Sequence, residues 1–176
     1  MKKKFSIVLI FLAVVLLFTF FLGRSTPQAK AQETILLEDD FESYTVGTFP
    51  QPPWDLWFNG YGDRYQVIVD TVSASGHKSL KMVGSFGWAA VAARLLTLSN
   101  RMGFEAMVMV QNWGINNSGA EVAFVKKRSA SVWWSWARVS FLANGFIHSS
   151  GQNLQRYSLN TWYKVKIQVI GNQITV

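Results

Sequence analysis

Cysteine is absent from this chain of 176 residues, and histidine occurs only twice. Without cysteine the protein can form no disulfide, and no N-terminal cysteine can carry a lipid. Two histidines alone also cannot supply the three or four ligands of a usual zinc site. The fold must therefore be stabilised by packing. Eight tryptophans contribute to this packing, since a large aromatic side chain buries about 150–250 Å².

Closely spaced carboxylates are also lacking in most of the chain. A glycosidase needs two carboxyl groups about 5–5.5 Å or 6.5–9.5 Å apart. If the segments 103–111 and 120–128 form a hairpin, Glu105 and Glu121 lie on the order of 13 Å apart, which is too far. We therefore expect a protein that is not an enzyme. The later acidic residues are isolated in the sequence: Asp55, Asp63, Asp70, Glu105 and Glu121.

The N-terminal segment has the features of a secretory signal peptide. Residues 2–4 are all lysine, residues 5–22 are almost wholly apolar, and Ala29-Lys30-Ala31 matches the small-x-small cleavage site. The pattern predicts a signal peptide over residues 1–31 and a mature domain over residues 32–176. The alternative is an uncleaved membrane anchor, although the apolar run is near the lower limit of about 17–25 residues for a span. Either way, we expect the domain to be secreted or at the cell surface.

Removal of the signal peptide changes the charge of the chain. The whole chain is formally +7, from 17 basic and 10 acidic residues. Five of the basic residues lie within residues 1–31, and all ten acidic residues follow them, so the mature chain is 12 − 10 = +2. A nucleic-acid partner would require a dense basic face. We expect no nucleic-acid partner, and a membrane partner only through an uncleaved anchor.

The mature part has no sustained helical periodicity. Short segments that alternate apolar and polar residues recur instead, separated by Gly, Asn and Ser clusters. Such alternation predicts β-strands, and many short strands predict an all-β sandwich. The predicted strands lie near residues 35–42, 65–70, 79–83, 86–96, 103–111, 120–128, 131–142, 144–148, 161–170 and 172–176.

The last two predicted strands are the clearest. Within 161–170 the odd-numbered residues from Tyr163 to Val169 are apolar and the even-numbered ones are polar, so the odd-numbered face should be buried. Gly171-Asn172 follows, and both residues tolerate the positive φ that a tight hairpin requires. The chain then ends at Val176 within a predicted strand. We therefore expect a domain truncated at its C-terminus, with at least one closing strand missing.

Three segments carry a resemblance to a known superfamily. They are EDDFESYTVGTFP at residues 38–50 with Trp54 after it, VSASGHKSLKM at residues 72–82, and NTWYKVKI at residues 160–167. Together they resemble the concanavalin A-like lectin/glucanase superfamily in its laminin-G-like form. The resemblance implies a jelly roll of two antiparallel sheets, one of them concave. It does not fix the function, because this fold is used by lectins, adhesion modules and hydrolases.

The resemblance also bears on catalysis and on metal binding. Related glucanases have an E-x-D-x-x-E strand motif, and this sequence has none. Several members of the superfamily hold a structural Ca²⁺ near the first strand. Asp39 and Asp40 lie there, and Ca²⁺ takes 6–8 oxygen ligands, so they are the candidate ligands of a Ca²⁺ cofactor. The alternative is a solvated acidic edge.

Aromatic residues provide the candidate ligand-binding site. In residues 132–141 (VWWSWARVSF), a period of two places Trp134, Trp136, Arg138 and Ser140 on the less apolar face of a strand. Two indole rings beside an arginine can line a shallow groove for a sugar. The alternative is that all the tryptophans of this segment belong to the core. Trp113 is a further candidate because it lies in a polar loop beside asparagines.

These observations favour a non-catalytic, exported carbohydrate-binding or adhesion-type module. Its expected partner is a glycan or a cell-surface polysaccharide. Two other functions stay open at this point. The chain could be a fragment of a glycoside hydrolase or another polysaccharide-active enzyme of the same fold, or a structural spacer domain of a larger surface protein.

Overall fold

The computed structural model describes residues 34–59, 65–84, 89–97, 99–113, 119–127 and 133–176. The predicted signal peptide lies outside these residues. The chain divides into two compact units, Met1–Leu37 and Glu38–Val176, and all strands of the described part belong to the second. Among the described residues, none forms a helix long and apolar enough to cross a membrane.

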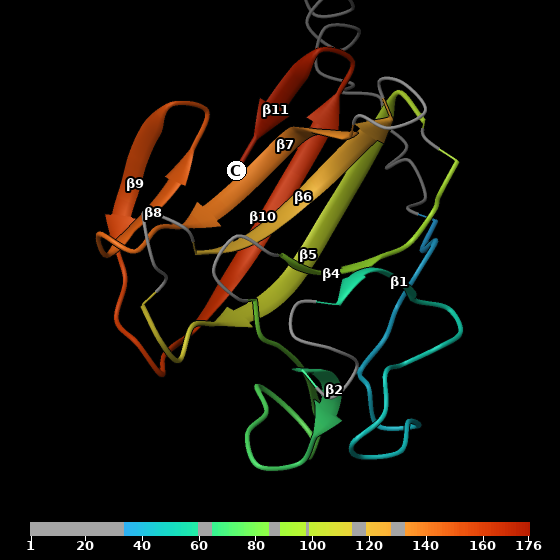
Figure 1. Cartoon of the computed structure of the whole chain (residues 1–176). Helices are drawn as coiled ribbons and strands as arrows, with labels where there is room; N and C mark the ends of the chain where they lie inside the picture. The colour runs from blue at the N-terminus through green and yellow to red at the C-terminus, as the bar shows by residue number, and fades with distance from the viewer. Residues whose placement is uncertain (1–33, 60–64, 85–88, 98, 114–118, 128–132) are drawn as a thin grey trace, which may run out of the picture. The chain divides into compact units, whose positions relative to one another are not determined.

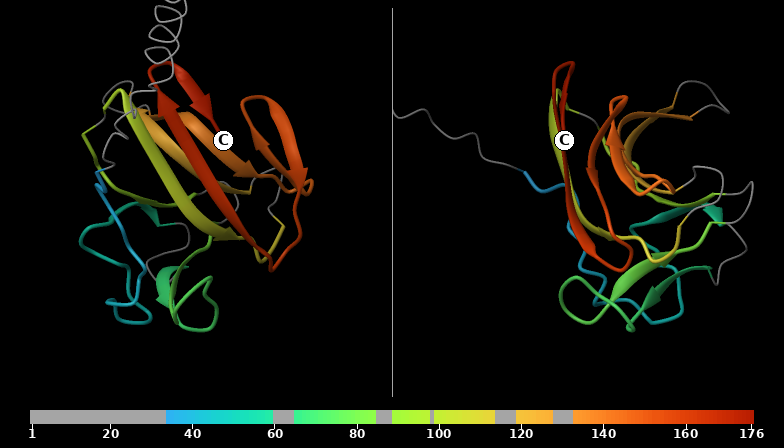
Figure 2. Two further views of the ribbon diagram at one scale, coloured as in Figure 1. Left: turned by 180° about the vertical axis from the view of Figure 1, so that it is seen from behind. Right: turned by 90° about the vertical axis from the view of Figure 1, so that its left-hand side faces the viewer.

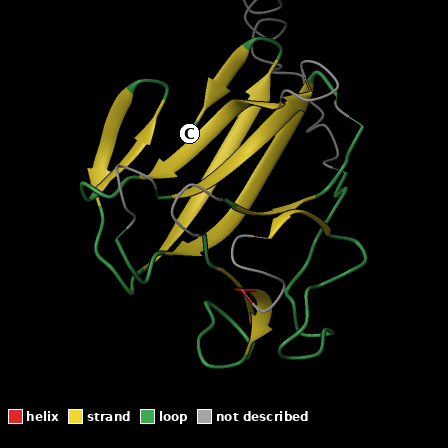
Figure 3. Ribbon diagram, viewed as in Figure 1, coloured by secondary structure: helices red, strands yellow, loops and turns green. Residues whose placement is uncertain are grey.

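The described part of the second unit is all-β, as the alternating sequence patterns predict (Figure 3). Every strand pair is antiparallel. The strands are β1 (Asp55–Asn59), β2 (Gln66–Val69), β3 (Ser79–Met82), β4 (Ala90–Ala93), β5 (Arg101–Met109), β6 (Ala120–Lys127), β7 (Trp133–Phe141), β8 (Phe146–Ser149), β9 (Gln152–Arg156), β10 (Trp162–Ile170) and β11 (Gln173–Thr175).

The strands form two larger sheets and two short pairs (Figure 1). One sheet has the order β11-β10-β5, and the other has the order β6-β7-β8-β9. The short pairs are β1 with β4 and β2 with β3. Figure 2 shows the two larger sheets as separate layers. This arrangement of antiparallel sheets is consistent with a β-sandwich.

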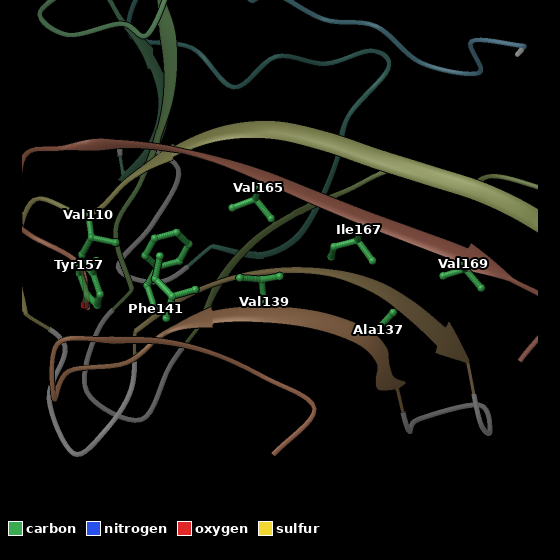
Figure 4. Packing of buried hydrophobic residues seen from close by; sticks show 9 residues of the cluster. Val110, Ala137, Val139, Phe141, Tyr157, Val165, Ile167 and Val169 are labelled. Atoms are coloured by element: carbon green, nitrogen blue, oxygen red, sulfur yellow. The ribbon is translucent and has the colours of Figure 1, made fainter. Parts of the chain in front are cut away.

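The core lies between β10 and β7. Val165, Ile167 and Val169 of β10 are buried, whereas the residues between them are exposed, which confirms the predicted face of this strand. Figure 4 shows these side chains pointing toward β7. There they meet three buried residues of β7, Ala137, Val139 and Phe141. Alternation with a period of two thus gives each of these strands one apolar face, and the two apolar faces pack together.

The predicted hairpin at Gly171 is confirmed. Ile170 pairs with Gln173, so two residues connect β10 and β11. Gly171 has a φ of +58°, which glycine adopts without steric cost. On its other side β10 pairs along its whole length with β5, from Trp162 opposite Met109 to Ile170 opposite Arg101.

The structure corrects the strand prediction at four points. Residues 35–42 contain no strand, because a side chain bonds to the backbone there: Phe41 N–H donates to Asp39 Oδ1 at 2.9 Å, and Phe41 has a φ of +64°. β1 was missed, and so was β9, whose sequence QNLQR is exposed throughout and lacks alternation. The supposed hairpin of 103–111 with 120–128 does not exist either, since β5 pairs with β10 and β6 pairs with β7.

A buried amide in β2 has no visible partner. The Gln66 side chain is completely buried, and neither Oε1 nor Nε2 has a hydrogen-bond partner among the residues that the structure describes. Burying an unsatisfied polar group costs about 1–3 kcal/mol. Ile68, two residues on, is also fully buried, so both side chains lie on the inner face of β2.

This burial predicts the effect of Gln66→Met. Methionine has a similar length and shape but no hydrogen-bonding amide, so the free energy of unfolding should rise by about 1–3 kcal/mol. Chemical denaturation of the mature domain measures this change. Gln168→Met on the exposed face of β10 is the control, and it should change the free energy by no more than about 0.5 kcal/mol. Destabilisation by Gln66→Met would show that the amide has a bonding partner.

Candidate functional site

Trp113 is a half-exposed aromatic residue that rests on the folded domain. Its side chain is in the loop after β5, and the residue is 48% exposed. The indole ring lies 5.2 Å from the ring of Tyr157, between centroids, with an interplanar angle of 50°. A Cβ atom added at Gly145 would lie 3.5 Å from the same indole, which is an ordinary van der Waals contact. The indole therefore lies beside Gly145, and the glycine itself is explained by its φ of +84°.

Tyr157 is a fixed support for the indole. Its hydroxyl donates to the carbonyl of Leu142 at 2.8 Å, and its ring makes an edge contact with Phe141 at 5.3 Å. Burial raises the pKa of the Tyr157 phenol, so the hydroxyl stays protonated and continues to donate. Because Phe141 belongs to the core, a chain of aromatic contacts links the core to Trp113.

The strands β8 and β9 place a second group of side chains beside this support. Tyr157 N–H donates to the carbonyl of Gly145 at 3.0 Å, and the next residues along, Phe146 and Arg156, pair across the two strands. The Arg156 guanidinium carbon lies 4.5 Å from the centroid of the Phe146 ring, a cation–π contact. Sequence reasoning missed this pair, because its two members are ten positions apart and meet only when β8 and β9 pair.

Arg138 lies on the outer face of the four-stranded sheet, opposite to the face of its buried neighbours Ala137 and Val139. Its side chain is 52% exposed, and a guanidinium nitrogen lies 3.5 Å from Glu121 Oε2. Ser140 Oγ donates to the same carboxylate oxygen at 3.2 Å. Arg138 is thus an exposed residue, and β6 provides its acidic neighbour.

The other two residues of the predicted groove fall where β7 is irregular. The pairing with β6 skips Trp136, since Phe124 is opposite Ala137 and Val125 is opposite Ser135. The strict period of two that joined Trp134, Trp136 and Arg138 is therefore interrupted at Trp136. The side chains of Trp134 and Trp136 lie outside the described residues.

The structure thus separates the predicted site residues. Trp113 contacts Tyr157, which belongs to the core, whereas Arg138 projects from the opposite face of the sheet. Phe146 and Arg156 follow both of them in sequence, on β8 and β9. The group that surrounds Trp113 is consequently an aromatic platform at the start of the β8–β9 hairpin rather than a groove along β7.

The two acids considered for catalysis lie on different sheets. Glu105 is on the exposed face of β5, and its Oε1 lies 2.7 Å from Lys164 Nζ, an ion pair that lowers the pKa of Glu105. Glu121 is on β6 beside Arg138. Each carboxylate lies on the side of its own sheet that faces away from the core. The two cannot flank one glycosidic bond.

Asp39 is held by three hydrogen-bond donors. Its Oδ1 accepts from Phe41 N–H, and its Oδ2 accepts from Tyr44 Oη at 2.8 Å and from Trp54 Nε1 at 2.7 Å. Burial and the hydrogen bond to Asp39 raise the pKa of Tyr44 to about 12. Asp40 Oδ1 accepts from a backbone N–H at 3.0 Å. Donor hydrogens point to the Asp39 carboxylate where a cation would bind, so the residues present do not fit a Ca²⁺ site centred there.

Metal removal tests this fit. A site filled at a hundred times its Kd would stabilise the domain by about 2.7 kcal/mol. Because the Asp39 carboxylate is already satisfied, we expect the same melting temperature in excess EDTA and in millimolar Ca²⁺. The opposite result would be a melting temperature that rises with Ca²⁺ in the wild type but not in Asp39→Asn. It would show that Ca²⁺ binds at Asp39.

Glu42 fastens the turn at residues 73–78 to the N-terminal loop. Its Oε1 accepts hydrogen bonds from the backbone N–H groups of His77 at 2.6 Å and Lys78 at 2.8 Å. Lys78 Nζ donates back to the carbonyls of Glu42 and Tyr44. A Cβ atom at Gly76 would collide with the Glu42 carboxylate, which explains the glycine. Two of the segments that resemble the lectin/glucanase superfamily therefore bind each other.

These bonds make the stability of the domain depend on the ionisation of Glu42. The two backbone donors lower the pKa of Glu42 below its ordinary value of 4.5. A carboxyl group whose pKa is lowered on folding stabilises the folded state at pH values above its ordinary pKa. This stabilisation is lost as the pH falls through the lowered pKa. We therefore expect Glu42→Gln to reduce the melting temperature at pH 7 and to converge with the wild type in acid. Asp70→Asn, which replaces an exposed acid, is the control; a constant difference across pH would contradict this account.

No family model, curated protein or solved structure matches this chain. The similarity of residues 38–50, 72–82 and 160–167 to the concanavalin A-like superfamily therefore stays a prediction from those segments. The function must be inferred from the side chains that the fold brings together.

Proposed function

We propose that this chain is an exported, non-catalytic carbohydrate-binding or adhesion-type module of the concanavalin A-like, jelly-roll type. In this proposal residues 1–31 direct export, and the mature domain acts outside the cell or at its surface. Trp113 stacks against a pyranose ring of a glycan or cell-surface polysaccharide. Polar side chains around the indole then contact the sugar hydroxyls.

The position of Trp113 is the observation that supports this proposal. About half of Trp113 is exposed, so a large aromatic surface is accessible to a ligand. The indole is also held in place, with Tyr157 on one side and Gly145 against its edge. A rigid aromatic surface binds a ligand at a low cost in conformational entropy. Gln111 and Asn112, both exposed, precede the indole and can donate to and accept from hydroxyl groups.

Two features argue against the other candidate functions. A glycoside hydrolase needs an acid pair, and Glu105 and Glu121 lie on separate sheets. A structural spacer has no need of a supported, half-exposed indole. The Trp113 platform therefore favours ligand binding over a purely structural spacer, and the separation of the two acids argues against the hydrolase.

Substitution of Trp113 tests the proposal. In pull-downs with insoluble polysaccharides and on a glycan array, we expect Trp113→Leu to abolish binding, because leucine covers Tyr157 but offers no aromatic face. Trp113→Phe should retain part of the binding. The melting temperatures of both variants serve as the control for folding.

The groove predicted on β7 is tested in the same assays. The double variant Trp134→Ala, Trp136→Ala should still bind if Trp113 is the platform. Loss of binding in this double variant, together with full binding by Trp113→Leu, would move the site to β7. If the wild type binds no glycan, the proposal is wrong and the structural spacer is the function that fits.

A further inference from the structure

The charges of the mature chain are divided along the sequence. All ten acidic residues lie at or before Glu121. Residues 32–121 contain five basic residues, so their net charge is 5 − 10 = −5, and residues 122–176 are +7 with no acid. The sum is the +2 of the mature chain. The seven basic residues are Lys126, Lys127, Arg128, Arg138, Arg156, Lys164 and Lys166.

Folding distributes this positive charge over two sheets, and the described residues form one ion pair on each sheet. On the three-stranded sheet, Lys164 forms an ion pair of 2.7 Å with Glu105. On the four-stranded sheet Glu121 is the only acid in the sequence of the four strands, and it lies 3.5 Å from Arg138. No carboxylate of that sheet is left for Arg156.

Arg156 is exposed and available to an anion. Among the residues that the structure describes, no carboxylate lies within ion-pair distance of its guanidinium. Its guanidinium carbon lies 4.5 Å from the centroid of the Phe146 ring. The planar set of guanidinium N–H groups matches the geometry of a carboxylate or a sulfate.

Arg156 is also adjacent to the proposed sugar platform. It directly precedes Tyr157, the residue on which Trp113 rests, and it pairs with Phe146, the residue after Gly145. Arg156 is the last residue of β9, and the chain passes directly from it to the tyrosine that supports the indole. An extended polysaccharide that stacks on Trp113 can continue past this edge toward Arg156.

We infer that the module selects acidic polysaccharides, and that Arg156 binds the carboxylate or sulfate group of a sugar. This inference rests on the proposed function, because it names the class of glycan that the Trp113 platform holds. Phe146 is a positioning residue for Arg156, because its ring lies 4.5 Å from the guanidinium carbon.

Matched pairs of polysaccharides test the inference. Affinity electrophoresis and calorimetry would compare polygalacturonate with its methyl ester, and dextran sulfate with dextran. Within each pair the sugar backbone is the same and only the anionic group differs. We expect tighter binding of the acidic member, and the two pairs distinguish carboxylate from sulfate. Arg156→Gln should weaken binding of the preferred acidic polysaccharide roughly ten-fold or more, as the loss of hydrogen bonds to a charged group predicts.

Lys166→Gln is the matched control, since it removes one positive charge from an exposed position on the other sheet. It should leave the affinity unchanged within about two-fold, because exposed charges are screened beyond about 10 Å in 0.1 M salt. Equal affinity for the acidic and neutral members would overturn the inference and leave the proposed function standing. Binding of no polysaccharide would overturn both. Equally tight binding of double-stranded DNA would show attraction to any polyanion and would also overturn the inference.

Discussion

The packing of β10 against β7 is the interaction on which the rest of the domain depends. No disulfide is available, and the buried cluster consists largely of the inward faces of these two strands. Val165, Ile167 and Val169 face Val139 and its neighbours, while every second residue of β10 is exposed. Each sheet thus gains a buried face from the alternation of its own sequence. The outer faces are left free to differ in charge and in function.

The core also determines where the proposed binding surface lies. Phe141 packs on Tyr157, and Tyr157 supports Trp113, so the indole is an outward continuation of the buried aromatic cluster. The indole lies beside Gly145, and the pairing of β8 with β9 at this point brings Arg156 close to the ring of Phe146. An aromatic surface and an unpaired guanidinium are therefore positioned by one hairpin. This combination suits a ligand that has both an apolar sugar face and an anionic group.

Features that depend on the local alternation of apolar and polar residues were predicted from the sequence. Features that depend on the pairing of distant segments were not. The buried face of β10 and the turn at Gly171 follow from neighbouring residues, and both are confirmed. The pairing of β5 with β10 joins segments far apart in the chain, and no local sequence pattern predicts it. Trp113 was identified by its polar loop. Arg156 was not, because its importance arises from its pairing with Phe146, and the irregularity at Trp136 cannot be read from alternation.

The central claim is that the Trp113 platform and the neighbouring Arg156 bind one acidic polysaccharide. A titration of the isotopically labelled mature domain with short polygalacturonate chains, followed by NMR, tests it most directly. The account predicts that the indole N–H of Trp113 and the backbone amides of Gly145, Phe146 and Arg156 shift together along a single binding curve. Shifts confined to the outer face of β10 around Lys164, or the absence of any shift, would contradict it.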